Sequence, residues 1–222
     1  MLRFSRFGIC FDLDGTLIDS GPKGFIQLCK VAKSLNLPIN TETEKLLKSM
    51  WGQSATTLVS TIWPKIDAQL FFKKWEELDM NEPFPTFTGT KEALSRLFSF
   101  YPLTVLTNRN IRTTVAQLEH NDLLRYFGLI TAVGSEKYKK PHPKSFDPIL
   151  NHYKSLWMLP EDIIFVGDTV EGDWKLAQSL DLEFYAVTCG GMDTREKFLL
   201  AGISEDHIIK TVAELPEILI GR

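Results

Sequence analysis

Two aspartates, Asp12 and Asp14, stand one residue apart in the stretch FDLDGTLIDS, directly after an apolar run at residues 7–11. The run has the length and composition of a buried strand, so both carboxylates are expected where that strand ends. Two like charges this close repel each other unless a cation bridges them or one of them stays protonated. Both outcomes are useful to an enzyme, so the pair indicates a site of chemistry.

Further polar side chains follow later apolar runs and extend this set. In an open parallel sheet, ligands bind beyond the carboxyl ends of the strands, so these residues are expected to converge on one crevice. Carboxylates can bind a hard cation through oxygen, while a hydroxyl, an amine and the cation can hold a phosphoryl group. Taken singly, each has a plainer interpretation as a turn carboxylate, a helix cap or a surface lysine. The candidates are Thr107 and Asn108, Lys140, and Asp168 and Asp173.

The elements that position these residues are predicted from β-rich runs that alternate with helical patterns. Such runs occur at residues 103–106, 129–133, 163–166 and 184–187. Together with the first strand they predict an α/β fold, a three-layer Rossmann-like core in which helices cover both faces of a parallel sheet.

Residues 19–85 have a purely helical texture and are predicted to form a cap of four helices inserted after the first strand. Residues 1–18 and 86–222 then form the core. Thr41 and Glu44 match a capping box at the start of the second helix of the insert. The prolines of NEPFP mark the return to the sheet and predict a hinge there, paired with one near residue 20.

Composition excludes several classes of protein. The chain has 222 residues, 44% of them hydrophobic, which is enough for a substantial core. A net charge of -3 without a block of Lys and Arg argues against nucleic acid as a partner and favours a small solute. No apolar stretch reaches the ~20 residues of a membrane span, so a cytoplasmic protein without a membrane partner is expected. The three cysteines, Cys10, Cys29 and Cys189, are expected to be reduced and buried.

Four motifs occur in the order of a known superfamily: DLDGT at residues 12–16, LTN ending at Asn108, KPHP from Lys140, and GDTVEGD at residues 167–173. With them, the chain resembles the haloacid dehalogenase superfamily hydrolases, in the phosphoglycolate phosphatase-like branch that has a helical cap. The resemblance covers nearly the whole chain, and four motifs in order are far more specific than one.

The resemblance implies a Mg²⁺-dependent phosphatase that forms an aspartyl-phosphate. Asp12 resembles the nucleophile and Asp14 the general acid and base, while Thr107 and Lys140 resemble the phosphate holders. The chemistry agrees, because an anionic carboxylate attacks an anionic phosphoryl group only when positive charge screens the encounter. A second carboxyl two residues on can protonate the leaving group and later deprotonate water.

The resemblance also implies a magnesium site and a substrate site. Asp168, with Asp12 and the backbone carbonyl of Asp14, resembles the metal site, and Asp173 would support it through water or from the second shell. Arg109 could pair with a substrate carboxylate, although a plain surface arginine is an equal alternative. Gly15 permits a close backbone turn at Asp14. The full predicted substrate-binding set is Gly15, Thr16, Asn108, Arg109, Gln53 and Ser54, the last two in the cap loop SMWGQS.

The expected substrate is a small phosphorylated metabolite of the phosphoglycolate type, and the expected assembly is a monomer or homodimer. A sugar phosphomutase of the same superfamily shares all four motifs and is the first alternative. It would need a group that deprotonates the sugar, for which IDSGPKG offers only Lys23. A non-catalytic, receiver-like module that accepts phosphate on one aspartate is the second alternative.

Overall fold

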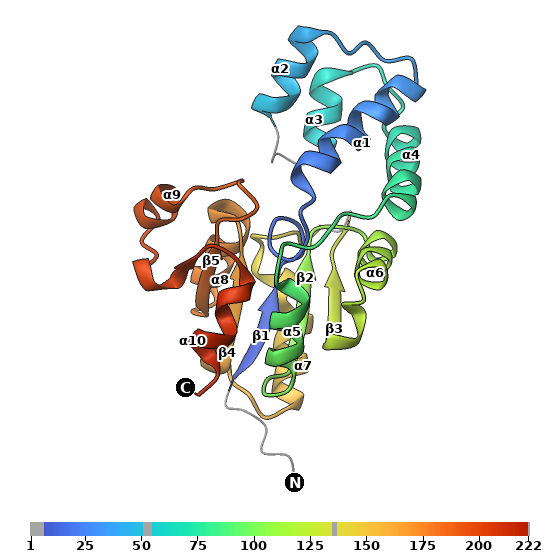
Figure 1. Cartoon of the computed structure of the whole chain (residues 1–222). Helices are drawn as coiled ribbons and strands as arrows, with labels where there is room; N and C mark the ends of the chain where they lie inside the picture. The colour runs from blue at the N-terminus through green and yellow to red at the C-terminus, as the bar shows by residue number, and fades with distance from the viewer. Residues whose placement is uncertain (1–6, 51–54, 135–136, 222) are drawn as a thin grey trace. The chain divides into compact units, whose positions relative to one another are not determined.

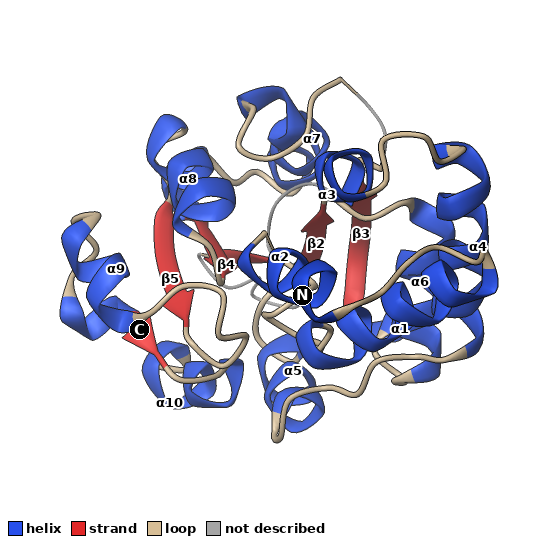
Figure 2. Ribbon diagram, turned by 90° about the horizontal axis from the view of Figure 1, so that it is seen from above, coloured by secondary structure: helices blue, strands red, loops and turns tan. Residues whose placement is uncertain are grey.

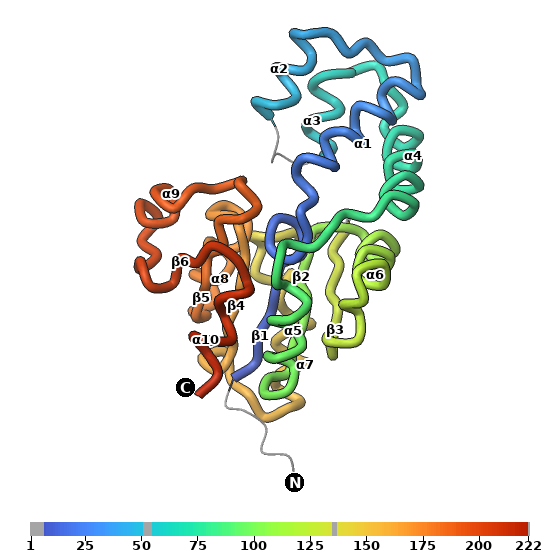
Figure 3. The backbone as a smooth tube through the Cα atoms, viewed as in Figure 1, coloured from blue at the N-terminus to red at the C-terminus, as the bar shows by residue number. Residues whose placement is uncertain are grey.

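The chain forms two compact units, Met1–Gly21 with Phe84–Arg222 and Pro22–Pro83. The structure is a computed structural model that describes residues 7–50, 55–134 and 137–221. Figure 3 traces the chain out of the larger unit after the first strand and back ahead of helix α5. The larger unit holds residues 19–21 because the Asp19 N–H donates to the Pro85 carbonyl at 2.8 Å and Ile18 bridges Thr86. That the smaller unit acts as a cap stays a prediction.

The larger unit is built on one six-stranded sheet in which every pair of neighbouring strands is parallel, in the order β3-β2-β1-β4-β5-β6. This confirms the predicted α/β fold. The last strand was not predicted, because a two-residue element carries no periodic pattern. The strands are β1 (Gly8–Phe11), β2 (Leu103–Thr107), β3 (Phe127–Ala132), β4 (Ile163–Gly167), β5 (Glu183–Val187) and β6 (Ile208–Ile209).

Helices cover both faces of this sheet, which gives the predicted three layers (Figure 2). Ile9 and Phe11 pack into one buried cluster and Cys10 into the other, so successive residues of β1 serve opposite faces. This is why the central strands are apolar without alternation. One face is covered by α5 (Thr90–Phe98), α6 (Ile111–His120) and α10 (Leu215–Leu219), the other by α7 (Asp147–Ser155), α8 (Lys175–Ser179) and α9 (Arg195–Leu200).

Short helical turns connect these elements. The 3₁₀ turns are η1 (Leu124–Tyr126), η2 (Pro143–Phe146), η3 (Pro160–Asp162), η5 (Glu205–His207) and η6 (Val212–Glu214). Within the described ranges, no helix is both long and apolar enough to cross a membrane.

The smaller unit contains the four predicted helices (Figure 1) and its own buried cluster, which includes Leu28, Val59 and Phe71. The predicted capping box is wrong. The N-cap of the second helix is Asn40, whose Oδ1 accepts the Thr43 N–H at 2.8 Å, so Thr41 lies inside the first turn. The helices are α1 (Gly21–Ser34), α2 (Thr41–Ser49), α3 (Ala55–Ile62) and α4 (Ala68–Asn81).

The cysteine prediction holds in part. All three thiols are free, and Cys10 is fully buried, but Cys29 and Cys189 are half-buried. Burial raises the pKa of the Cys10 thiol to about 12, so this thiol stays protonated and acts as a packing group.

Candidate active site

Three of the predicted residues lie where the order of the strands reverses. Strand β1 lies between β2 and β4, and the chain builds outward from it in both directions. Asp12 follows β1, Thr107 ends β2 and Asp168 follows β4. Such a switch point at the carboxyl edge of a parallel sheet is where α/β proteins bind ligands.

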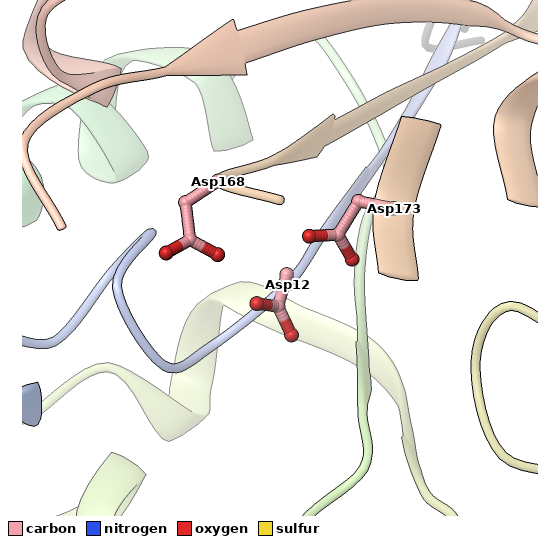
Figure 4. Close-up of side chains that lie close together, drawn as sticks. All are labelled: Asp12, Asp168 and Asp173. Carbon is pink, nitrogen blue, oxygen red and sulfur yellow. The ribbon is translucent and has the colours of Figure 1, made fainter. Parts of the chain in front are cut away.

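Three aspartates form a buried acidic cluster at this edge. The carboxylates of Asp12, Asp168 and Asp173 lie side by side in Figure 4, with one oxygen of each within 4.8 Å of the others. The three residues are 5%, 2% and 1% exposed. Asp168 Oδ2 is buried and accepts no hydrogen bond from any described residue. A buried carboxylate oxygen without a donor is costly, and a set of such oxygens suits a hard divalent cation.

Lys140 supplies positive charge to this cluster. Its Nζ donates to Asp12 Oδ1 at 2.5 Å and to Asp173 Oδ1 at 2.7 Å, and its side chain is 5% exposed. Burial alone would lower the pKa of Lys140, but the charges of the two aspartates outweigh burial and raise it. Lys140 is therefore held as an ammonium. Asn108 holds the main chain at Lys140, because Asn108 Oδ1 accepts the backbone N–H of Lys140 at 2.8 Å.

One ammonium does not neutralise three buried carboxyls. Burial raises the pKa of Asp12 to about 7, with Lys140 opposing the shift and Asp173 adding to it. Burial and the charges of Asp12 and Asp173 also raise the pKa of Asp168 well above its usual value. A second cation at the cluster would favour the ionised form of both groups. The residues present therefore fit a bound divalent metal.

Asp173 lies in a short π-helix, η4 (Val170–Trp174), which follows β4. π-helical turns often occur at functional sites. Asp173 Oδ2 accepts from the Thr169 N–H at 3.0 Å and the Thr169 hydroxyl at 2.6 Å. Asp193, which the sequence reasoning missed, accepts the Val170 N–H at 2.6 Å and pairs with Lys197. Asp193 is 7% exposed and ties the loop after β4 to the segment after β5.

We predict that Asp193→Ala lowers the free energy of unfolding by about 1–3 kcal/mol, because the buried Val170 N–H loses its acceptor. Urea denaturation followed by circular dichroism measures the change. The control is Glu171→Ala in the same segment, whose side chain is 69% exposed and pairs only with Lys175 in the described contacts. An exposed pair of this kind contributes about 0.3–0.5 kcal/mol. Equal losses in both variants would contradict a role for Asp193 in holding the loop.

Two glycines let the backbone approach the acidic cluster. Gly15 has φ +77°, and a Cβ there would meet Asp168 Oδ2 at 2.0 Å. A Cβ on Gly190 would meet the Gly15 carbonyl at 2.5 Å and Asp168 Oδ2 at 2.7 Å. The predicted reason for glycine at position 15 was the turn, and the approach of Asp168 is a second one. Gly190 was missed, although two adjacent glycines after an apolar run signal a close approach.

Asp14 lies outside the cluster and is held by Arg109. Arg109 Nε donates to Asp14 Oδ2 at 3.1 Å and Nη2 donates to Asp14 Oδ1 at 2.6 Å. Burial alone would raise the pKa of Asp14, but the charge and hydrogen bonds of Arg109 outweigh it and hold that pKa below its usual value. The Arg109 side chain is 14% exposed, so most of it is buried against neighbouring residues.

The remaining predicted residues are placed as follows. Thr107 is buried, and its Oγ1 accepts the Arg109 N–H at 3.1 Å. It does not cap the next helix, because Asn110 does so. Thr16 is fully buried, and its hydroxyl has no hydrogen-bond partner among the described residues. Gln53 and Ser54 lie outside the described residues. The substrate-binding roles of all these residues stay predictions.

Comparison with known proteins decides the family. Residues 9–187 match the family described as haloacid dehalogenase-like hydrolase. The chain belongs to this hydrolase family. The resemblance read from the four motifs is thereby confirmed, as is the prediction that the chain is an enzyme.

Individual relatives of this hydrolase agree with the assignment. A phosphoglycolate phosphatase of Salmonella typhi is 29% identical over 210 residues, which cover 82% of this chain and 81% of the relative. A HAD hydrolase of Bacillus subtilis, solved with bound magnesium, has a TM-score of 0.77 at 18% identity and covers 97% of this chain and 99% of its own. A structure described as a β-phosphoglucomutase of Thermotoga maritima has a TM-score of 0.74 at 21% identity, with 96% and 98% covered. At these identities the two structures show the fold alone.

Proposed function

We propose that this hydrolase is a Mg²⁺-dependent phosphatase that cleaves a small phosphomonoester of the phosphoglycolate type through an aspartyl-phosphate. The observation that carries the proposal is the setting of Asp12. Its carboxylate is buried at the end of β1, bonded to the Lys140 ammonium and next to the Asp168 carboxylate. A nucleophilic carboxylate needs positive charge around it before it can approach a phosphoryl group.

In the proposed first step, a carboxylate oxygen of Asp12 attacks phosphorus and the bond from phosphorus to the ester oxygen breaks. Asp14, in its protonated form, delivers its proton to that oxygen, so the alcohol leaves neutral and Asp14 becomes a carboxylate. Lys140 and Thr107 hold the phosphoryl oxygens. In the second step, Asp14 takes a proton from water as the water oxygen attacks phosphorus. The bond from phosphorus to Asp12 then breaks, which restores the carboxylate and releases inorganic phosphate.

Asp12, Asp168 and the backbone carbonyl of Asp14 would hold the magnesium ion. Asp173 is better suited to support it indirectly, because its oxygens already accept from Lys140 and Thr169. Asp168 Oδ2 has no such donor among the described residues. When bound, the ion supplies Lewis-acid stabilisation of the negative charge that builds up on the transferring phosphoryl group.

Removal of divalent metal is predicted to stop the reaction. Excess EDTA should lower phosphate release to background, and added Mg²⁺ should restore it, because the cluster offers only oxygen ligands. Mg²⁺ without substrate should also raise the melting temperature of the wild-type protein and not that of Asp168→Asn. Full activity in excess chelator would refute the metal requirement.

The alternative is a phosphomutase, the activity by which the Thermotoga maritima structure is described. A mutase would need a group that deprotonates the sugar, and Lys23 is the candidate. Lys23 Nζ donates a hydrogen bond to the Pro83 carbonyl at 2.6 Å. Continuous release of inorganic phosphate from a phosphomonoester supports the phosphatase. An isomerised sugar phosphate supports the mutase, and a single equivalent of bound phosphate supports a receiver-like module.

A further inference from the structure

The ion pair between Arg109 and Asp14 has no part in the two steps above. It joins the loop after β2 to the loop after β1, and both Asp14 carboxylate oxygens accept from the Arg109 guanidinium. The guanidinium also lies over the Phe84 ring, 5.3 Å from its centroid. The Asp14 side chain is 35% exposed and the Arg109 side chain 14%, so the pair is partly open to solvent.

The position of Asp14 determines what Arg109 will meet. If Asp14 passes a proton to the ester oxygen, the alcohol part of the substrate lies beside the Asp14 carboxyl. The guanidinium, at 2.6 Å from that carboxyl, then lies beside the alcohol part too. The backbone N–H of Arg109 donates to Thr107 Oγ1. This hydrogen bond fixes Arg109 beside Thr107, which is a proposed phosphate holder. A guanidinium recognises a carboxylate through two parallel hydrogen bonds, the pattern it now makes with Asp14.

We propose that Arg109 selects substrates whose leaving group bears a carboxylate, and that such a carboxylate replaces Asp14 as the partner of Arg109. The proposal rests on the proposed phosphatase function. The exchange frees Asp14 at the moment when its carboxyl is needed at the ester oxygen. An alcohol without an anionic group leaves the pair closed, so it reacts slowly even when it binds. The guanidinium has five N–H donors and can pass from one carboxylate to the other without losing both partners.

The test compares 2-phosphoglycolate with ethyl phosphate, which lacks the carboxylate, on wild type, Arg109→Ala and Arg109→Lys. Wild type should prefer 2-phosphoglycolate in kcat/KM by at least about tenfold. In Arg109→Ala, kcat/KM for 2-phosphoglycolate should fall by about 10- to 100-fold, because the charge-assisted pair between Arg109 and the substrate carboxylate is lost. Both a higher KM and a lower kcat should contribute to this fall. The loss of Arg109→Ala on ethyl phosphate should be much smaller, since this substrate offers Arg109 no carboxylate. Arg109→Lys keeps the positive charge but cannot make two parallel hydrogen bonds to a carboxylate. Its kcat/KM for 2-phosphoglycolate should lie between those of wild type and Arg109→Ala.

Arg96→Ala is the control, because Arg96 is an exposed arginine of the same unit that pairs with Glu217. It should leave both substrates unchanged. An equal loss on both substrates in Arg109→Ala would overturn the proposal, because it would show that Arg109 only supports Asp14. A wild type that cleaves ethyl phosphate as well as 2-phosphoglycolate would also overturn it, with the phosphatase function intact. A folded wild type that cleaves no phosphomonoester overturns the phosphatase function and the role of Arg109 together.

Discussion

Replacement of Asp12 by asparagine is expected to lower kcat by at least about a thousandfold, because a neutral amide cannot form the aspartyl-phosphate. The fold should persist. Lys140 keeps its hydrogen bond to Asp173, and burial already disfavours a charge at position 12, as the raised pKa of Asp12 indicates. Phosphate release under saturating substrate measures the loss, and urea denaturation measures the free energy of unfolding.

The matched control is Asp147→Asn, an exposed aspartate in the first turn of α7. It should retain full turnover. Acid quenching with ³²P-labelled substrate should trap labelled protein in wild type and not in Asp12→Asn. Turnover of Asp12→Asn within about tenfold of wild type would refute the nucleophile assignment.

The sheet could be predicted because its central strands are buried on both faces. In β1 and β4 every residue is buried, so the pattern is a short continuous apolar run rather than an alternation. The order of the strands in the sheet could not be predicted from the pattern of apolar residues. It follows from which crossovers the chain makes, and the two-residue β6 is defined only by its pairing with β5.

The sequence predicted which residues form the candidate site, but it did not predict the contacts between their side chains. Carboxylates and a lysine after strand ends imply convergence, but they do not say which side chain meets which. The Arg109 and Asp14 pair spans 95 positions of the chain, and nothing near either residue indicates it. Asp193 was missed for a similar reason, since its partner Val170 contributes a backbone N–H that any residue type would supply. The capping box failed because Asn40, one residue earlier, is itself a strong N-cap.

Lys140→Met is expected to abolish turnover and to destabilise the fold. The ammonium is buried and contacts Asp12 and Asp173, so its removal leaves a buried acidic cluster without this counter-charge. Loss of one partner of a buried ion pair costs about 3–5 kcal/mol. The control is Lys144→Met, an exposed lysine four residues on, which should change neither property. Urea denaturation of the two variants beside wild type measures the difference.

The stability lost in Lys140→Met should depend on pH. Burial raises the pKa of Asp12 from 3.8 to about 7, so the folded state binds a proton that the unfolded state has released, and stability falls as pH rises between these values. Lys140 opposes this shift, so the pKa of Asp12 should rise further in the variant. The free energy of unfolding of the variant should then continue to fall as pH rises above about 7. The deficit relative to wild type should therefore be small at about pH 5 and largest at about pH 8.5. Mg²⁺ should reduce the deficit at the higher pH, since it restores positive charge beside Asp12 and Asp168. A deficit that is constant across this range would mean that Lys140 stabilises the fold by packing alone.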